Sequence, residues 1–213
     1  MVCPPAQHLR LHGGQAIIFC MRKIILALFI LIIAGAAGYY IYHDLKNPNV
    51  RSSTSINLDV PDLDRPINMP ETLPEDAQKI AREKIEKITA DLKNNQDLFA
   101  SWLELGVYRK MIDDFEGAKE VWEYASLIRP ENSISFNNLG DLYGYYLKDN
   151  KKAEENFLKA LENGSDKVYI YRNAFDFYYL VMKDEVRAKQ ILEKGIELNP
   201  ESSQDLKNLL DGL

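Results

Sequence analysis

The chain has 213 residues, of which 46% are apolar and 27% charged, and its formal net charge is −6 at pH 7. This length and composition suit one soluble domain of ordinary size. The negative charge disfavours nucleic acid as a partner, because a nucleic-acid-binding domain favours a basic surface.

Residues 1–23 form an N-terminal segment without sustained periodicity, and its first 20 residues hold both cysteines and two of the three histidines. We expect this segment to be poorly ordered. A zinc site built from Cys3, His8, His12 and Cys20 is disfavoured, because the spacings fit no familiar pattern of zinc ligands. Cys20 is interpreted as a free thiol, with acylation beside a membrane as the alternative.

Residues 24–42 form 19 consecutive uncharged positions and are predicted to be a transmembrane helix. At about 1.5 Å rise per residue, such a helix spans roughly the 30 Å hydrocarbon core of a bilayer. Met21 and two cations precede the run, which is how export segments begin, so the true start is either Met1 or Met21. The flanking cations favour a cytoplasmic N-terminus. A signal peptide cleaved after Ala36 is the main alternative, and both interpretations place the following residues outside the cytoplasm.

Residues 43–71 are predicted to be a proline-rich linker, with prolines at positions 48, 61, 66 and 70 and no sustained apolar stripe. Prolines at this density favour extended backbone, so the segment is interpreted as a solvated tether. The alternative is that Val60, Leu63 and Ile67 pack on the domain that follows.

A soluble domain is expected over residues 72–213, and its first helix over residues 72–94. Thr72 and Glu75 stand three positions apart, with Pro74 in the first turn, which is the pattern of a capping box. Three apolar residues then follow at helical spacing: Ala81, Ile85 and Ile88.

The next segment, about residues 98–132, predicts two helices joined by a polar turn. The buried face of the first helix is expected to carry residues at i, i+3, i+4 and i+7, namely Trp102, Leu105, Gly106 and Arg109. The second helix repeats small and large residues, Ala118, Trp122 and Ala125, and the segment ends at Pro130.

This pattern recurs in residues 133–167 and again in residues 168–200. The first-helix positions reappear 34 residues later as Phe136, Leu139 and Gly140, and the second-helix positions 35 residues later as Ala153, Phe157 and Ala160. We expect the additional residue to lie in the turn between the helices. A third copy follows at a step of 35, with Tyr171, Ala174 and Phe175, then Ala188, Leu192 and Gly195. Phe175, in the place of a glycine, is expected to push the helices apart unless a neighbour yields.

At these residues the chain resembles the tetratricopeptide repeat family, whose motif reads Trp-x2-Leu-Gly-x2-Tyr, then Ala-x3-Phe, then Ala and Pro over about 34 residues. The resemblance covers roughly residues 98–200 and implies an all-α fold. The expected architecture is a right-handed α-solenoid of about three helical hairpins. Residues 72–94 would form a capping half-repeat and residues 201–213 a closing helix, which gives eight helices in the soluble domain.

Enzyme activity is not expected of this domain. It contains no histidine or cysteine, no glycine-rich phosphate loop and no nucleophile elbow. We therefore expect no catalytic residue, no cofactor and no metal. A protein or peptide partner is expected instead, because stacked helical hairpins form a groove lined by their first helices.

The family resemblance implies which residues line that groove, five from each repeat. They are Ala100, Leu103, Val107, Lys110 and Met111 in the first copy, Ile134, Asn137, Asp141, Gly144 and Tyr145 in the second, and Tyr169, Arg172, Asp176, Tyr179 and Leu180 in the third. Tyr143 and Tyr178 lie on the packing stripe and are predicted to belong to the core.

The groove is expected to bind a short segment that offers Lys or Arg between apolar anchors, since Asp141 and Asp176 stand one repeat apart beside tyrosines. The same aspartates disfavour a C-terminal carboxylate as ligand. The expected function is that of a single-pass membrane scaffold that binds its partner outside the cytoplasm. Two alternatives stay open: a structural, self-associating component of an envelope assembly, and a secreted or periplasmic protein released by signal cleavage.

Overall fold

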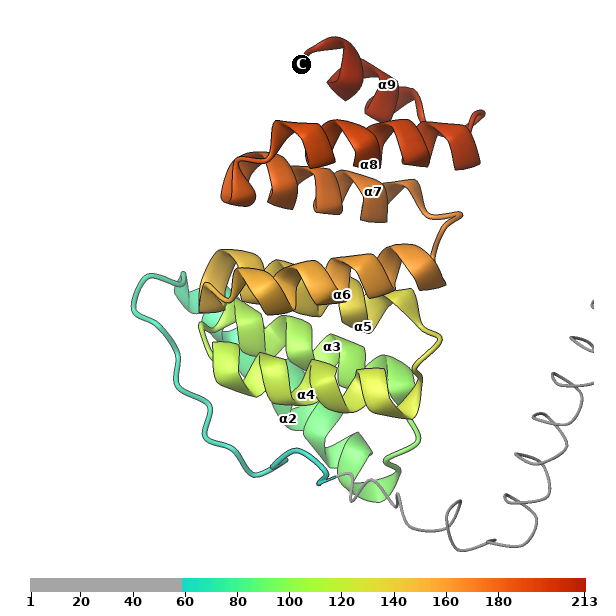
Figure 1. The fold of residues 1–213 in the computed structure, drawn as a ribbon. Coiled ribbons are helices and arrows are strands. Elements are labelled where there is room, and N and C mark those ends of the chain that lie inside the picture. Colours follow the sequence, from blue (N-terminus) through green and yellow to red (C-terminus); the bar gives the residue numbers. More distant parts are fainter. Residues whose placement is uncertain (1–58) are drawn as a thin grey trace, which may run out of the picture. The chain divides into compact units, whose positions relative to one another are not determined.

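The structure, a computed structural model, describes residues 59–213 (Figure 1). This part of the chain is all-helical, with eight α-helices and no strand, as the sequence predicts. The predictions made for residues 1–58, including the apolar run 24–42, lie outside the described residues. Among residues 59–213, no helix is both long enough and apolar enough to span a membrane.

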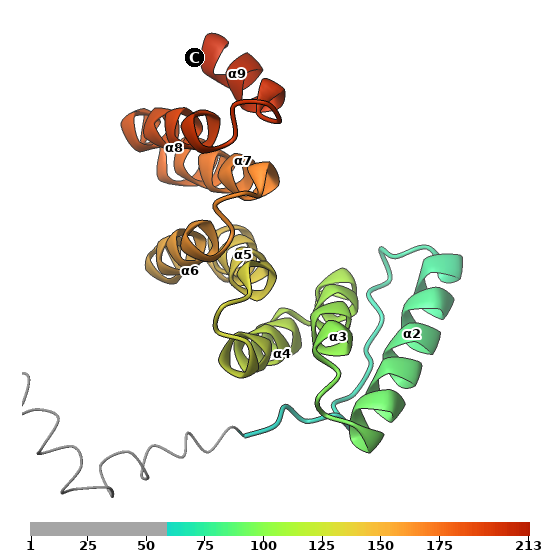
Figure 2. The same ribbon diagram turned by 90° about the vertical axis from the view of Figure 1, so that its right-hand side faces the viewer.

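The helices follow one another as antiparallel neighbours, and each packs on the next. Figure 2 shows α3, α5 and α7 on one side of the domain and α4, α6 and α8 on the other. Two π-helical segments, η2 (Leu142–Leu147) and η3 (Phe177–Met182), continue α5 and α7. The α-helices are α2 (Glu75–Asn94), α3 (Phe99–Met111), α4 (Phe115–Ile128), α5 (Ser133–Asp141), α6 (Asn150–Asn163), α7 (Val168–Asp176), α8 (Glu185–Leu198) and α9 (Gln204–Asp211).

The helix pairs approach closely where the sequence has glycine. A Cβ added to Gly106 would lie 2.2 Å from the indole Nε1 of Trp122, and one added to Gly140 would lie 2.8 Å from the ring of Phe157. Trp122 Nε1 also donates to the carbonyl oxygen of Leu103 at 3.1 Å. An aromatic ring of the second helix therefore covers the backbone of the first, and the close contacts predicted at these glycines are confirmed.

The third pair, α7 and α8, packs together with Phe175 in a buried position. Phe175 stacks on Tyr179, with ring centroids 5.4 Å apart. The position of Trp122 and Phe157 is taken here by the smaller Leu192. Gly195 makes room for Tyr171, whose ring carbon would lie 2.8 Å from an added Cβ. At these two positions α8 therefore carries smaller residues than α4 and α6 do.

The turns within the three pairs share one construction. The turns contain non-glycine residues in the left-handed region, Asp113, Lys148 and Lys183, with φ of 60°, 60° and 56°. The aspartate that follows each of them caps the second helix by accepting a backbone N–H bond. These caps join Asp114 to Gly117 at 3.0 Å, Asp149 to Lys152 at 3.1 Å and Asp184 to Arg187 at 3.0 Å.

The additional residue of the second and third repeats lies in the π-helical segments, so the prediction that it lies in the turn is wrong. In the first pair, the Asp114 N–H reaches five residues back to the Arg109 carbonyl oxygen at 2.9 Å. The corresponding bonds in the later pairs reach six residues back, also at 2.9 Å, from Asp149 to Tyr143 and from Asp184 to Tyr178. A π-helical turn holds more residues than an α-helical turn, so it absorbs the insertion and leaves the turn construction unchanged.

Residues 59–74 form an extended segment, here called the strap, which packs against α2 and the α3–α4 pair (Figure 2). Four of its side chains are partly buried in the core of these helices: Leu63, Ile67, Met69 and Leu73. Val60, by contrast, is 37% exposed. The solvated tether expected for residues 43–71 is therefore wrong for the part from Leu63 onward, because alternate apolar residues find a buried surface.

Helix α2 lacks the predicted capping box. It begins at Glu75 rather than at residue 72, and no side chain caps its N-terminus. Gln78 instead donates its side-chain amide to the carbonyl oxygen of Leu73 at 2.7 Å. The predicted apolar face is confirmed, since Ala81, Ile85 and Ile88 are buried.

The C-terminal end is closed by α9, as expected. Leu206 is fully buried and reaches Gly195 of α8, where an added Cβ would lie 2.6 Å from Leu206 Cδ1. Leu209 and Leu210 pack against the same cluster and are partly buried.

Candidate binding face

The side chains predicted to line a groove lie on α3, on α5 with η2, and on α7 with η3; this surface is here called the first-helix face. Several of its apolar side chains are open to solvent: Val107 is 50% exposed, Met111 43%, Ile134 37%, Tyr169 45% and Leu180 50%. Ala100 is exposed as well. Large apolar residues that recur in consecutive helix pairs and remain open offer a surface for a partner.

Polar contacts link the first helices across this face. Lys110 of α3 pairs with Asp141 of α5, with 2.5 Å between Nζ and the carboxylate oxygen. The same ammonium lies 4.9 Å from the centroid of the Tyr146 ring. Between the second and third pairs, Asn173 donates to the side-chain oxygen of Asn137 at 3.0 Å. The structure therefore brings together the predicted Lys110 and Asp141 from adjacent repeats, whereas Asn173 and Tyr146 were not predicted to belong to the groove.

Asp176, Arg172 and Tyr145 form the second charged part of the face. The Arg172 Nε lies 4.0 Å from the Asp176 carboxylate. Burial raises the pKa of Asp176, and the neighbouring Arg172 opposes the effect only in part. Burial also raises the pKa of Tyr145 to about 12, and the negative charges of Asp176 and Asp141 add to this. Tyr145 is therefore a neutral phenol at neutral pH, and it lies within the field of both carboxylates.

Other predicted groove residues are less accessible. Asn137 is only 6% exposed, and Gly144 is buried against Phe177, whose ring would lie 2.9 Å from an added Cβ. Leu103 is partly buried and packs on the core. Tyr179 is half-buried, because it stacks on Phe175. These four residues support the face rather than present side chains on it.

Tyr143 and Tyr178 belong to the core, as predicted, with 3% and 2% of their surface exposed. Each hydroxyl donates to a glutamate of a second helix: Tyr143 to Glu123, and Tyr178 to Glu154 at 2.9 Å. Each ring also lies beside a cation of the following helix, Lys152 at 5.0 Å and Arg187 at 5.9 Å from the ring centroids.

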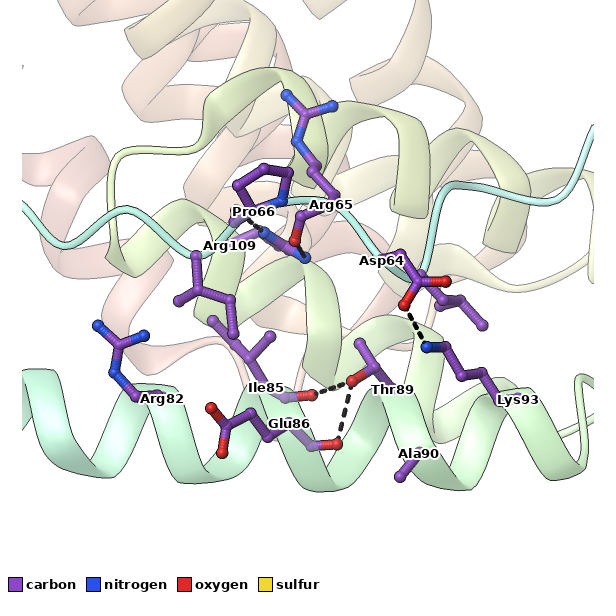
Figure 3. A pocket seen from close by; sticks show the side chains of 12 residues that line it. Asp64, Arg65, Pro66, Arg82, Ile85, Glu86, Thr89, Ala90, Lys93 and Arg109 are labelled. Carbon is purple, nitrogen blue, oxygen red and sulfur yellow. Dashed lines mark hydrogen bonds and ion pairs between the residues drawn. The ribbon is translucent and has the colours of Figure 1, made fainter.

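A buried arginine, whose role was not predicted from the sequence, joins the strap to the α3–α4 pair. Arg109 is 2% exposed, and burial lowers its pKa. Its guanidinium donates to the carbonyl oxygens of Arg65 at 2.9 Å and Pro66 at 2.8 Å (Figure 3). It also pairs with Asp114 at 3.2 Å. The sequence did hold one signal: Arg109 is the charged residue in an otherwise apolar and small stripe, and buried charge requires a partner.

Arg65 completes this cluster from the strap. Its Nε donates to Asp114 at 2.8 Å and its Nη1 to Glu120 at 3.1 Å. The hydrogen bond to Asp114 raises the pKa of Arg65. Two arginines and two carboxylates thus neutralise one another, which fixes the strap on the domain.

A pocket of about 440 Å³ lies between the strap and α2 (Figure 3). Asp64 and Lys93 form an ion pair there, and Thr89 donates to the carbonyl oxygen of Ile85 at 2.8 Å. Since these polar groups and Arg109 already bond within the protein, we interpret the pocket as a packing feature rather than a ligand site.

Neither the arrangement of possible metal ligands nor the comparison with known proteins identifies a different site. Within residues 59–213, no group of histidine, cysteine, aspartate and glutamate side chains is arranged to hold a metal ion. The chain matches no known family model and no curated protein. The exposed apolar side chains make the first-helix face the candidate site.

Proposed function

We propose that the described domain is a right-handed solenoid of three tetratricopeptide-like helix pairs, capped by α2 and α9, which binds a protein segment along the first-helix face. Three observations support the solenoid: the repeat of 34 to 35 residues, the glycine–aromatic contacts at Gly106 and Gly140, and the layering of first and second helices (Figure 2). In such an arrangement the first helices line one continuous concave groove.

The observation that carries the binding proposal is the order of side chains across the first-helix face. Positions that match in the three repeats form two mainly apolar rows, Ala100, Ile134 and Tyr169 near the helix starts, and Met111, Tyr145 and Leu180 near the helix ends. The polar positions, including Asp141 and Asp176, lie between these rows in each helix. A segment that offers a basic side chain between apolar anchors complements this order.

We propose further that residues 24–42 anchor the domain as a single-pass membrane protein, with a cytoplasmic N-terminus and the repeats outside the cytoplasm. Such a chain stays with membranes through carbonate washing and keeps residues 24–42, as mass spectrometry of the extracted protein would show. A mature chain that starts near Ala37 would instead show that the segment is a cleaved signal peptide.

Two leucines of equal exposure provide a matched test of the binding proposal. Leu180 on η3 and Leu158 on α6 are both 50% exposed, and they lie on a first and a second helix respectively. We expect Leu180→Ser to weaken capture of the natural partner by the full-length protein, because an apolar anchor is lost. Leu158→Ser should leave capture unchanged.

Equal effects of the two substitutions would show that the first-helix face is not the site. Helical circular dichroism of both variants serves as the control for folding. Sedimentation of the wild-type protein over a range of concentrations tests the alternative, a self-associating structural component, for which the captured species would be a second copy of the chain.

A further inference from the structure

The two aspartates of the first-helix face occupy the same place in consecutive repeats but have different surroundings. Asp141 is paired with Lys110 of the preceding repeat at 2.5 Å, and the Lys110 ammonium also lies 4.9 Å from the Tyr146 ring centroid. The residue that follows Lys110 by one repeat of 34 is Gly144. The preceding repeat therefore supplies no ammonium to Asp176 at this place.

The third repeat itself compensates Asp176 only in part. Arg172, one turn earlier on the same helix, lies 4.0 Å from the carboxylate, which is too far for a hydrogen bond, and half of its side chain is exposed. Within the part of the chain that the structure describes, no other cation lies within ion-pair distance of Asp176. The Asp176 side chain is 34% exposed, so its carboxylate is partly removed from water but still accessible to a partner.

Exposed apolar side chains share the first-helix face with this carboxylate. Tyr169 on α7 is 45% exposed and Leu180 on η3 is 50% exposed. An accessible carboxylate on an otherwise apolar face suits a basic side chain of a partner, because the ion pair and the apolar contacts act together.

We infer that Asp176 is the subsite that receives a basic side chain of the partner segment, whereas Asp141, already paired with Lys110, is not. The inference rests on the proposed function and names the chemistry of the residue bound. At the matching carboxylate one repeat earlier, Asp141, the protein supplies the cation itself from Lys110. At Asp176 the partner would supply the cation.

The subsite can be tested with small probes that differ only in charge. The full-length chain, with ¹³C-labelled aspartate carboxyl groups, is titrated in detergent with N-acetyl-arginine amide and, separately, with the neutral N-acetyl-citrulline amide. We expect a saturable shift of the Asp176 carboxyl resonance with the arginine probe and a several-fold smaller shift with citrulline. Asp176→Asn removes the resonance and so assigns it, and Asp141→Asn should leave the response of the Asp176 resonance unchanged.

Two outcomes would overturn the inference: an Asp176 resonance that shifts no more than that of the exposed Asp211, or equal shifts with both probes. Capture of the natural partner separates this inference from the proposed function. We expect Asp176→Asn to weaken capture about tenfold, the effect of one partly buried ion pair, and Asp141→Asn to change it less than about twofold. Loss of capture in Leu180→Ser without loss in Asp176→Asn would leave the proposed function intact and refute the subsite.

Discussion

The domain stabilises the charged form of Asp176 only in part, so ionisation of this carboxyl group lowers the stability of the folded protein. Burial raises its pKa above the ordinary value of aspartate. An acid whose pKa is higher in the folded than in the unfolded protein contributes stability that is present at low pH and is lost as the pH rises through the folded pKa. A binding residue that reduces stability at neutral pH is typical of functional sites.

We therefore expect Asp176→Asn to raise the midpoint of thermal unfolding at neutral pH. The gain should disappear at about pH 3, below the ordinary pKa of aspartate, where the wild-type carboxyl is protonated in both states. Calorimetry of the full-length protein at both pH values measures this. Asp141→Asn is the control and should not raise the midpoint, because it removes the partner of Lys110. A gain in Asp176→Asn that is equal at both pH values would contradict the assignment.

At the scale of elements, the strap is part of the domain because Arg109 bonds its backbone. An extended segment bonds few of its own carbonyl groups, so those that are buried need donors elsewhere. Arg109 supplies two donors to the carbonyl oxygens of Arg65 and Pro66. The strap and α2 thereby pack against the α3–α4 pair.

Arg109→Met is expected to destabilise the domain strongly, by about 1–3 kcal/mol for each buried carbonyl group left without a donor. Urea unfolding followed by circular dichroism measures the change. Arg82→Met on α2 is the matched control, because Arg82 is exposed, and its expected effect is within about 0.5 kcal/mol. Similar stabilities of the two variants would show that Arg109 does not fix the strap.

The sequence predicts the helix pairs well because each has two strong local signals, an apolar stripe of period 3.6 and a polar turn. The buried Trp102, Trp122, Leu139 and Phe157 all follow from these signals. The sequence signals do not locate the inserted residue, because an extra residue in the turn and one in a π-helical segment change the spacing between repeats by the same amount.

The strap and the pairing on the first-helix face depend on contacts between residues distant in sequence, which periodicity does not report. Arg109 bonds to carbonyl groups 43 and 44 residues earlier, and Lys110 pairs with Asp141, 31 residues later. The repeat spacing puts Asp141 and Asp176 at equivalent positions, but it does not tell that Asp141 has a close lysine partner whereas Asp176 has only Arg172 at 4.0 Å.

At the scale of the whole molecule, hydrogen bonds join each helix pair to the next. Tyr143 of η2 donates to Glu123 of α4, and Tyr178 of η3 donates to Glu154 of α6, so each of these first helices is bonded to the second helix of the preceding pair. Large exposed apolar side chains occur on both layers of helices, for example Leu180 on η3 and Leu158 on α6. The proposed function requires the partner to contact the first helices and not the second helices.

Site-specific photo-crosslinking in native membranes tests this division most directly. A photoreactive residue is placed in turn at three exposed first-helix positions, Val107, Met111 and Leu180, and at three exposed second-helix positions, Leu127, Leu158 and Val186. We predict one and the same crosslinked partner from all first-helix positions and no crosslink to it from the second-helix positions. Crosslinks to that partner from Leu127, Leu158 or Val186, with none from the first helices, would contradict the account.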